Sequence, residues 1–246
     1  MKKFEIVNAL IAKHGYNRYL EISTPTTGLC FGRVDQSSLH WRHRLVYRCP
    51  AGFRDGCEIT FRSEDENISH LLNAAMRCDI IFVDSYHTFE CSLRDLHYAL
   101  DRLSPGGAIV VHDCCPKNKS LCGPSFRPGS WFGVTYCAYI EFILSHTDLA
   151  YYTVDTDCGC GVIKKLSPDQ ATVIKKNSGK DCGSNHEITR LWFGERNQHR
   201  DMFDFFCQHR RELLKLISVK DFLATENIVL PRFLHWRENL AALLPT

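Results

Sequence analysis

The alternation of apolar and polar residues along the chain predicts strands separated by helices. Two runs, 78–84 (CDIIFVD) and 108–114 (AIVVHDC), are largely apolar, which is typical of strands buried on both faces of a sheet. Further strands are predicted from shorter apolar runs at 18–23, 43–50 and 57–63. Helical spacing of apolar residues predicts helices at 1–15, 67–77, 89–103 and 134–145.

This order of elements indicates an α/β fold, a doubly wound and mostly parallel sheet of the Rossmann-like type. Residues 150–166 predict an antiparallel hairpin that closes the sheet and turns at 157–159. We expect one α/β domain over 1–166, a polar linker over 167–187 and a helical C-terminal extension over 188–246, with a helical segment near 201–224. The extension could cap the sheet, cover the site or mediate dimerisation, so a homo-oligomer stays open.

Composition and charge narrow the class of protein. A net charge of +2 on 246 residues argues against a protein that binds nucleic acid by neutralising phosphates. No apolar run reaches the roughly 20 residues of a membrane span. The start of the chain places Phe4, Val7, Leu10 and Ile11 on one helical face, which indicates a packed helix rather than a signal peptide. We therefore expect a cytoplasmic protein whose partner is neither nucleic acid nor a membrane.

The chain has 13 cysteines, which is many for a protein of the cytoplasm. No CxxC pair occurs, and no two pairs have the spacing of a zinc finger. The favoured interpretation is small, reduced core residues. The alternative is a zinc site, for which the fold would have to bring together Cys114, Cys115, Cys122, Cys158 and Cys160.

The strongest motif lies between residues 79 and 116. An apolar strand ends on Asp84, VDSYHTFE (83–90) leads into a helix, and Pro105-Gly106-Gly107 leads into a strand that ends at His112 and Asp113. This pattern resembles the second half of the class I S-adenosylmethionine-dependent methyltransferases. It is most similar to bacterial small-molecule methyltransferases with an IDGDHSYE...DL...L.PGG.IV.HD pattern, and the resemblance covers roughly residues 18–165.

The resemblance implies methyl transfer from S-adenosylmethionine to a small molecule, at oxygen rather than nitrogen. His87 or His112 would take the proton with the help of Asp113, because histidine titrates near neutral pH. Each histidine could instead be a hydrogen-bonded residue at the edge of the cleft. The cofactor would lie at the carboxyl ends of the strands and at the turn after the first strand; the residues concerned are Glu21, Ser23, Thr27, Gly28, Asp65, Asp84 and Ser85.

A metal is a further implication of the resemblance. Some small-molecule methyltransferases of this fold bind a divalent ion with acids at the same two strand ends, which makes Asp84 and Asp113 candidate ligands. The residue after Asp113 is Cys114, where Mg²⁺ would prefer an oxygen ligand. The sequence therefore leaves the metal unassigned and does not favour one.

Two departures from the family pattern motivate a function of another class. The turn STPTTG (23–28) has a single glycine where the family turn is glycine-rich, and Pro25 lacks an N–H. The second strand ends on Tyr47, Arg48 and Cys49 rather than on an acid that would contact the ribose hydroxyls. The alternative is a binding or interaction protein that keeps the fold without turnover.

The segment PGSWFGVTY (128–136) follows the last strand of the motif. Trp131, Phe132 and Tyr136 could form an aromatic wall against a planar or sugar-like acceptor. The other interpretation is packing in the core at the start of a helix.

Overall fold

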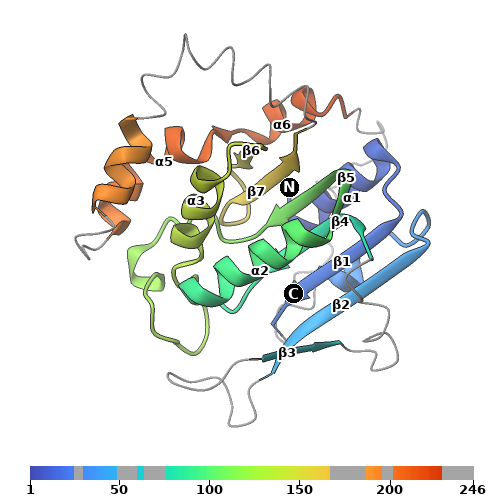
Figure 1. Cartoon of the computed structure of the whole chain (residues 1–246), viewed down its shortest axis with the longest axis horizontal. Coiled ribbons are helices and arrows are strands. Elements are labelled where there is room, and N and C mark those ends of the chain that lie inside the picture. The colour runs from blue at the N-terminus through green and yellow to red at the C-terminus, as the bar shows by residue number, and fades with distance from the viewer. Residues whose placement is uncertain (25–29, 49–59, 64–75, 167–186, 196–201, 229–246) are drawn as a thin grey trace, which may run out of the picture.

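The structure, a computed structural model, describes residues 1–24, 30–48, 60–63, 76–166, 187–195 and 202–228. Its centre is an eight-stranded sheet in the order β3-β2-β1-β4-β5-β7-β6-β8. Figure 1 shows this sheet crossing the molecule, with helices packed along it. The predicted α/β fold, with a mostly parallel sheet that closes in an antiparallel hairpin, is confirmed.

Four neighbouring strands form the parallel part of the sheet: β2 (Trp41–Arg48), β1 (Arg18–Ser23), β4 (Cys78–Asp84) and β5 (Leu103–Val111). Ser23 pairs with Asp84, so β1 and β4 end at the same level of the sheet. The observed bounds of β1 are those of the strand predicted at 18–23. The carboxyl ends of parallel strands meet at one edge, which is where a ligand site belongs in this fold.

The strand β3 (Thr60–Ser63) runs antiparallel to β2, with Ser63 opposite Leu45. The expectation that this strand also ends beside the others is therefore wrong. Residues 49–59 alone connect β2 to β3, whereas parallel neighbours need a crossover of about a dozen residues or more. Because β3 runs the other way, its carboxyl end lies away from the carboxyl ends of β1 and β4.

The other edge of the sheet contains the predicted hairpin, β6 (Leu149–Val154) and β7 (Cys160–Lys165). β7 also pairs antiparallel with β5. In the turn between them, Asp157, Cys158 and Gly159 all have positive φ, the left-handed region that non-glycine residues seldom adopt. The turn brings Asp157 to the same edge as the ends of β4 and β5, as its contacts described below show.

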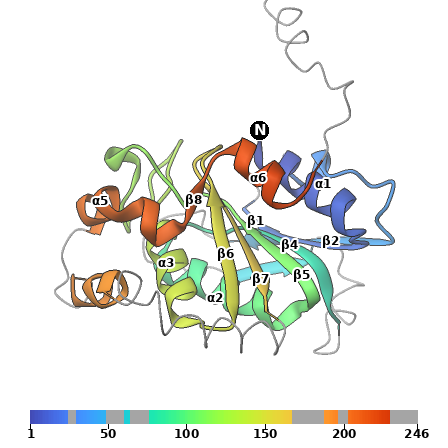
Figure 2. The same cartoon turned by 90° about the horizontal axis from the view of Figure 1, so that it is seen from above.

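Helices cover both faces of the sheet, as Figure 2 shows. α1 (Lys3–His14) and α6 (Val219–Thr225) pack on one face, and α2 (Phe89–Arg102) and α3 (Thr135–Ser145) pack on the other. The apolar stripes predicted at the N-terminus and at 89–103 and 134–145 are thus confirmed as helices. The helix predicted at 67–77 and the linker predicted at 167–187 fall almost entirely outside the described residues.

The helical segment predicted near 201–224 is interrupted. α5 (Met202–Leu214) is followed by Lys215, whose φ is 46°. A short strand, β8 (Leu216–Ile217), then pairs with β6. Ser218 begins α6, and its hydroxyl accepts the backbone N–H of Asp221 at 3.1 Å. The C-terminal segment therefore adds a strand to the sheet as well as helices.

The Pro105-Gly106-Gly107 turn lies inside β5 rather than before it, because β5 begins directly after α2. A Cβ atom on Gly107 would lie 2.6 Å from the carbonyl oxygen of Asp79 in β4. Only glycine allows this close approach, and the register of β4 against β5 shifts beside it. Two single turns of 3₁₀ helix, η2 (Phe31–Arg33) and η4 (Lys119–Leu121), complete the described elements with assigned bounds.

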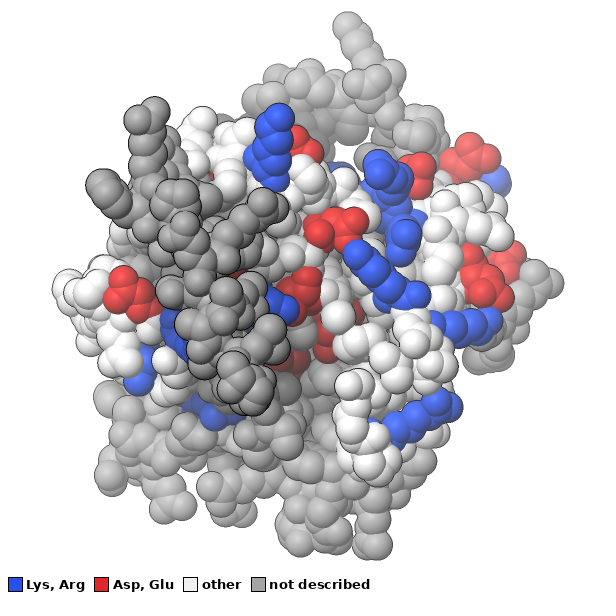
Figure 3. Space-filling model, turned by 180° about the vertical axis from the view of Figure 1, so that it is seen from behind, with Lys and Arg blue, Asp and Glu red and all other residues white. Residues whose placement is uncertain are grey.

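The surface carries charges of both signs. In the view of Figure 3, Lys and Arg side chains lie beside Asp and Glu side chains over the described part of that face. No helix within the described ranges is long and apolar enough to span a membrane.

Candidate functional site

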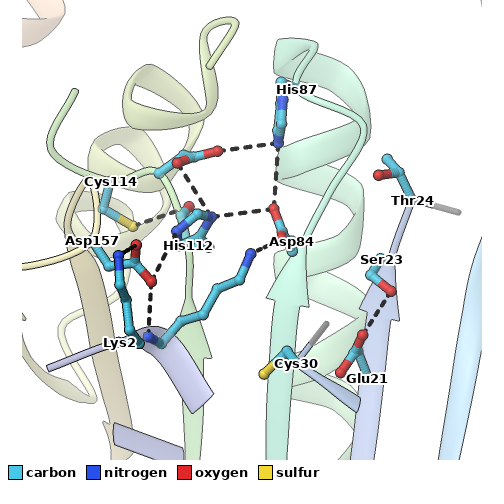
Figure 4. A network of polar contacts seen from close by, with 12 residues as sticks. Lys2, Glu21, Ser23, Thr24, Cys30, Asp84, His87, His112, Cys114 and Asp157 are labelled. Atoms are coloured by element: carbon cyan, nitrogen blue, oxygen red, sulfur yellow. Dashed lines mark hydrogen bonds and ion pairs between the residues drawn. The ribbon is translucent and has the colours of Figure 1, made fainter. Parts of the chain in front are cut away.

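Two acid–histidine pairs meet at the carboxyl ends of β4 and β5. Asp84 is the last residue of β4, and Thr88, which caps α2, holds the short segment that contains His87. Nε2 of His87 lies 3.4 Å from Oδ1 of Asp84 and 3.3 Å from Oδ2 of Asp113. His112 follows β5, and its Nδ1 lies 3.4 Å from Oδ1 of Asp84 and 3.2 Å from Oδ1 of Asp113. The structure thus brings the four residues of the sequence motif together, and Figure 4 shows Asp84, His87 and His112 among them.

The backbone at the end of β5 is strained. Asp113 has a φ of 58°, in the left-handed region. The next two residues are fixed by the hairpin turn, because the N–H groups of Cys114 and Cys115 donate to the carbonyls of Gly159 and Cys158. Strain of this kind persists where the surrounding structure enforces it, and it clusters at functional sites. The turn therefore holds the Asp113 carboxylate against the two histidines.

Lys3 and Asp157 belong to the same cluster, although the sequence analysis did not select them. Nζ of Lys3 lies 2.8 Å from Oδ2 of Asp84. Asp157 accepts the backbone N–H of Lys3 at 2.9 Å and lies 3.9 Å from Nε2 of His112. The available signals were a pair of lysines before the first helix and an acid in the predicted hairpin turn, and neither indicates a partner by itself.

The neighbouring charges shift the pKa values of the cluster. Burial alone would raise the pKa of Asp84, but His112, His87 and Lys3 hold it well below the usual range. Burial favours neutral imidazoles, yet the Asp84 and Asp113 carboxylates raise the pKa of His87, and they raise that of His112 to about 10. His112 therefore holds a proton at neutral pH.

A cavity of about 320 Å³ lies over this cluster, at the lower end of the range for small-molecule sites. Its polar lining contains Lys3, Thr24, Asp84, His87, His112 and Asp113. Four aromatic residues also line the cavity and are termed the aromatic wall: Tyr86, Phe126, Trp131 and Phe132. Trp131 packs edge-on against His87, with ring centroids 5.6 Å apart. The wall expected from Trp131 and Phe132 is thus present.

Tyr136, the third residue expected in the wall, lies elsewhere. It is buried and packs on Phe206 of α5, with ring centroids 4.7 Å apart. The start of α3 is positioned by Gly133, which has a φ of 57°, and a Cβ atom there would lie 1.9 Å from the carbonyl oxygen of His87. Val134 donates its N–H to the same oxygen at 2.9 Å. Glycine is therefore required where the aromatic wall meets His87.

The residues predicted on the cofactor side are only partly described. Glu21 is fully buried and accepts hydrogen bonds from Tyr19 and Ser23, and Nε of Arg44 lies 3.3 Å from its Oε1. Arg44, which the sequence analysis missed, also donates to the Thr24 carbonyl at 2.8 Å. The side chains of Glu21 and Ser23 are thus hydrogen-bonded to each other at the end of β1, as Figure 4 shows. Neither residue lines the cavity, whereas Thr24 does.

Three further predicted residues remain without a structural account: Thr27, Gly28 and Asp65 lie outside the described residues. Ser85 is described and is buried, but it does not line the cavity. Tyr47, near the end of β2, donates to Asp95 of α2 and points to that helix. Among the described residues, Thr24 after β1 and Asp84 at the end of β4 line the cavity.

S-adenosylmethionine fits the described part of this site. Thr24 and Asp84 place a hydroxyl and a carboxylate in one cavity over the ends of β1 and β4, and these groups suit the cationic end of that cofactor. Thr24 and Asp84 would hold it there.

A resident divalent metal does not fit. Ligand atoms of Asp84, His87 and Asp113 do lie within 4.8 Å of one another, and both nitrogens of His112 and Oδ1 of Asp113 are buried without a hydrogen bond. However, an ammonium group already contacts Asp84, and the protonated His112 lies between the two carboxylates. A metal would have to bind beside both cations.

The cysteines take no part in a metal site in the described structure. None of the ten described cysteines forms a disulfide, and none belongs to a cluster of potential metal ligands within the described ranges. Cys114 is buried and its thiol donates to the Val111 carbonyl at 3.4 Å. This is the behaviour of a small core residue.

Comparisons with known proteins agree with the geometry of the fold. Residues 8–114 match the family model Methyltransf_24, described as a methyltransferase domain. No curated protein matches the chain. The match ends just after Asp113, so it includes both strand ends that carry the cluster.

Solved structures show distant likenesses. One is the O-methyltransferase TomG from Streptomyces achromogenes, involved in tomaymycin synthesis and solved with S-adenosylmethionine: TM-score 0.38, 13% identity, 66% of this chain and 79% of that one covered. Another is the methyltransferase PaMTH1 of Podospora anserina, bound to S-adenosylhomocysteine: TM-score 0.37, 14% identity, 65% and 77% covered. These scores are too low to support an argument about the ligand of this chain. Residues 8–114 thus match a methyltransferase domain, and the strand order is that of a Rossmann-like methyltransferase fold.

Proposed function

We propose that the protein transfers a methyl group from S-adenosylmethionine to an oxygen of a planar small molecule. The observation that carries this proposal is the cavity over the ends of β1, β4 and β5, which combines a histidine between two carboxylates with an aromatic wall. The wall would hold a flat acceptor by stacking and apolar contact. The imidazole beside it would accept the hydroxyl proton.

His87 is the proposed general base. It lines the cavity beside Trp131, and the carboxylates of Asp84 and Asp113 lie within 3.4 Å of its Nε2, where they would stabilise the imidazolium that forms. His112 is a poorer base, since its raised pKa keeps it protonated. We assign His112 the role of a buried cation that holds the two carboxylates together.

Methyl transfer needs little more from the chain than this arrangement. Bound S-adenosylmethionine would supply an electrophilic methyl group, and His87 would take the proton from the attacking hydroxyl of the acceptor. Thr24 and Asp84 would bind one partner and the aromatic wall the other, so that the two meet in line. Positioning of this kind can supply much of the rate acceleration.

The alternative remains a protein that keeps the fold without turnover. It is favoured by Glu21, whose two carboxylate oxygens are already bonded inside the protein, and by the lack of an acid at the end of β2. On this alternative neither S-adenosylmethionine nor its product binds.

Calorimetric titration with S-adenosylmethionine and, separately, S-adenosylhomocysteine tests the proposal. We expect saturable binding in the micromolar range. Asp84→Asn should weaken the binding of both ligands, whereas Asp101→Asn, an exposed change on α2, should not. No heat and no thermal shift from folded protein would reject the proposal and favour the alternative. If binding occurs, S-adenosylhomocysteine release should be measured against a panel of phenols, catechols and sugars, where phenolic acceptors should react best.

A further inference from the structure

We propose that Lys3 is the resident cation of this site and that its ammonium group keeps divalent metal ions away from Asp84 and Asp113. Nζ of Lys3 lies 2.8 Å from Oδ2 of Asp84, and the lysine side chain is 16% exposed. This inference goes beyond methyl transfer, since it concerns which cation the two carboxylates accept. It holds whether or not the protein turns over a substrate.

Contacts of both the backbone and the side chain fix the position of Lys3. The backbone N–H of Lys3 donates to Asp157, the hydroxyl of Thr156 donates to the Met1 carbonyl, and α1 begins at Lys3 itself. Nζ also lies 5.8 Å from the centroid of the Phe82 ring, within the range of a cation–π contact. A side chain fixed in this way loses little further conformational freedom when it pairs with Asp84. The Lys3 side chain is therefore fixed within the site, unlike a mobile lysine on the surface.

The cluster already contains two cationic groups without a metal. Three carboxylates, from Asp84, Asp113 and Asp157, face the Lys3 ammonium and the imidazole of His112. His87 adds a further nitrogen donor that contacts both Asp84 and Asp113. A divalent ion between the carboxylates would add two positive charges beside Lys3, and repulsion at such distances is strong in a buried site.

The donor set that would remain without Lys3 is a metal-binding one. Oxygen atoms of Asp84 and Asp113 and a ring nitrogen of His87 lie within 4.8 Å of one another. Mixed carboxylate and imidazole ligands suit Mn²⁺ and Zn²⁺. Lys3→Met keeps much of the apolar stem and removes the charge, so it should uncover a site that the natural chain keeps closed.

Mn²⁺ alone is the probe. Full-length protein is treated with a chelator, titrated with Mn²⁺, and free Mn²⁺ is measured by electron paramagnetic resonance. We expect wild type to show no stoichiometric site and Lys3→Met to bind one equivalent, at least about tenfold more tightly than wild type. Adding His87→Gln to Lys3→Met should abolish this gain. Lys2→Met, on a lysine that is 68% exposed, and the charge-keeping Lys3→Arg should both behave as wild type.

Two results would overturn the inference. The first is a stoichiometric Mn²⁺ site in wild type that Asp84→Asn removes. The second is folded Lys3→Met protein, checked by circular dichroism, that binds Mn²⁺ no better than wild type does. If Lys3→Met does not fold, Lys3→Gln takes its place with the same expectation, and the wild-type titration remains decisive by itself. S-adenosylmethionine binding is measured separately, so this inference and the proposed function can fail independently.

Discussion

His87 and His112 show how the same residue type takes different roles a few ångströms apart. Both contact Asp84 and Asp113, and both have raised pKa values. His112 lies deeper, with both ring nitrogens buried and Asp157 as a third neighbouring acid. His87 instead packs against Trp131 of the aromatic wall. Under the proposed function, this contact with the aromatic wall favours His87 over His112 as the base.

Replacing His87 by Gln should lower kcat for methyl transfer by about 10²–10⁴-fold, the usual contribution of a general base. Binding of S-adenosylhomocysteine should change little, because glutamine keeps a polar side chain at the floor of the cavity. Product formation with an acceptor identified in the panel above measures kcat, and calorimetry measures binding. His97→Gln, an exposed change on α2, is the control. Unchanged kcat in the His87 variant would remove it from the mechanism.

The residues that could be located from the sequence are those that directly follow buried strands. Asp84, His112 and Asp113 end continuous apolar runs, and parallel strands bring such ends together. Lys3 and Arg44 could not be located in this way. Lys3 meets Asp84 across 81 positions of sequence, and Arg44 pairs with Glu21 only because β1 and β2 are neighbours in register. These partners are set by tertiary packing.

At the scale of elements, one carboxylate joins four parts of the fold. Glu226, just after α6, accepts hydrogen bonds from Tyr152 of β6 at 2.6 Å and from Lys164 of β7 at 2.6 and 2.7 Å. His14 at the end of α1 lies 2.8 Å from it. Burial would raise the pKa of Glu226, but Lys164, Tyr152 and His14 lower it. The ionised carboxylate therefore fastens α6 to the sheet and to α1.

Replacing Glu226 by Gln should cost roughly 1.5–3 kcal/mol of unfolding free energy at pH 7, the range for hydrogen bonds to a charged group. The pKa of Glu226 is lower in the folded state, so its contribution is complete above the unfolded-state value of about 4.3 and is lost as pH falls through the folded value. The difference in unfolding free energy between wild type and variant should therefore become smaller as the pH falls. Urea unfolding from pH 7 down to pH 3 tests this.

Glu212→Gln, an exposed change on α5, controls for the loss of a negative charge. If the difference in unfolding free energy between wild type and Glu226→Gln stayed constant down to pH 3, the charge of Glu226 would not stabilise the position of α6.

The elements themselves were predicted unevenly. The stripe at 89–103 and the run at 78–84 gave the elements observed, whereas the run at 108–114 gave a strand that begins earlier, at Leu103, and ends at Val111. The direction of β3 and the break at Lys215 depend on connection length and on pairing with a distant strand, which apolar periodicity does not report. Whether 1–166 and 188–246 form separate units stays a prediction.

At the scale of the whole molecule, the C-terminal segment covers the outer side of α3. Phe206 of α5 is fully buried against Tyr136 of α3, and Phe203 packs beside both. Trp192, from the helical segment at 187–195, is also fully buried and belongs to the same core cluster. These contacts describe packing on α3; whether the extension caps the sheet, covers the site or mediates dimerisation stays a prediction.

Phe206→Ala should therefore destabilise the whole protein by about 3–5 kcal/mol, as for other buried phenylalanines. Thermal unfolding followed by circular dichroism should show one transition at a lower temperature. Leu191→Ala, at a side chain that is 38% exposed, is the control and should leave the midpoint nearly unchanged. A separate early transition in the Phe206 variant would mean instead that the C-terminal segment unfolds alone and that its packing does not stabilise the sheet.

The contact between Gly133 and the His87 carbonyl has a mechanical consequence. The aromatic wall includes Trp131 and Phe132, which directly precede Gly133, and Val134 is hydrogen-bonded to His87. An outward swing of this segment, such as a bulky acceptor would need in order to enter, pulls on the backbone of the proposed base. The aromatic wall and the proposed base thus share one hydrogen-bonded stretch of backbone, so a displacement of the wall would also displace His87.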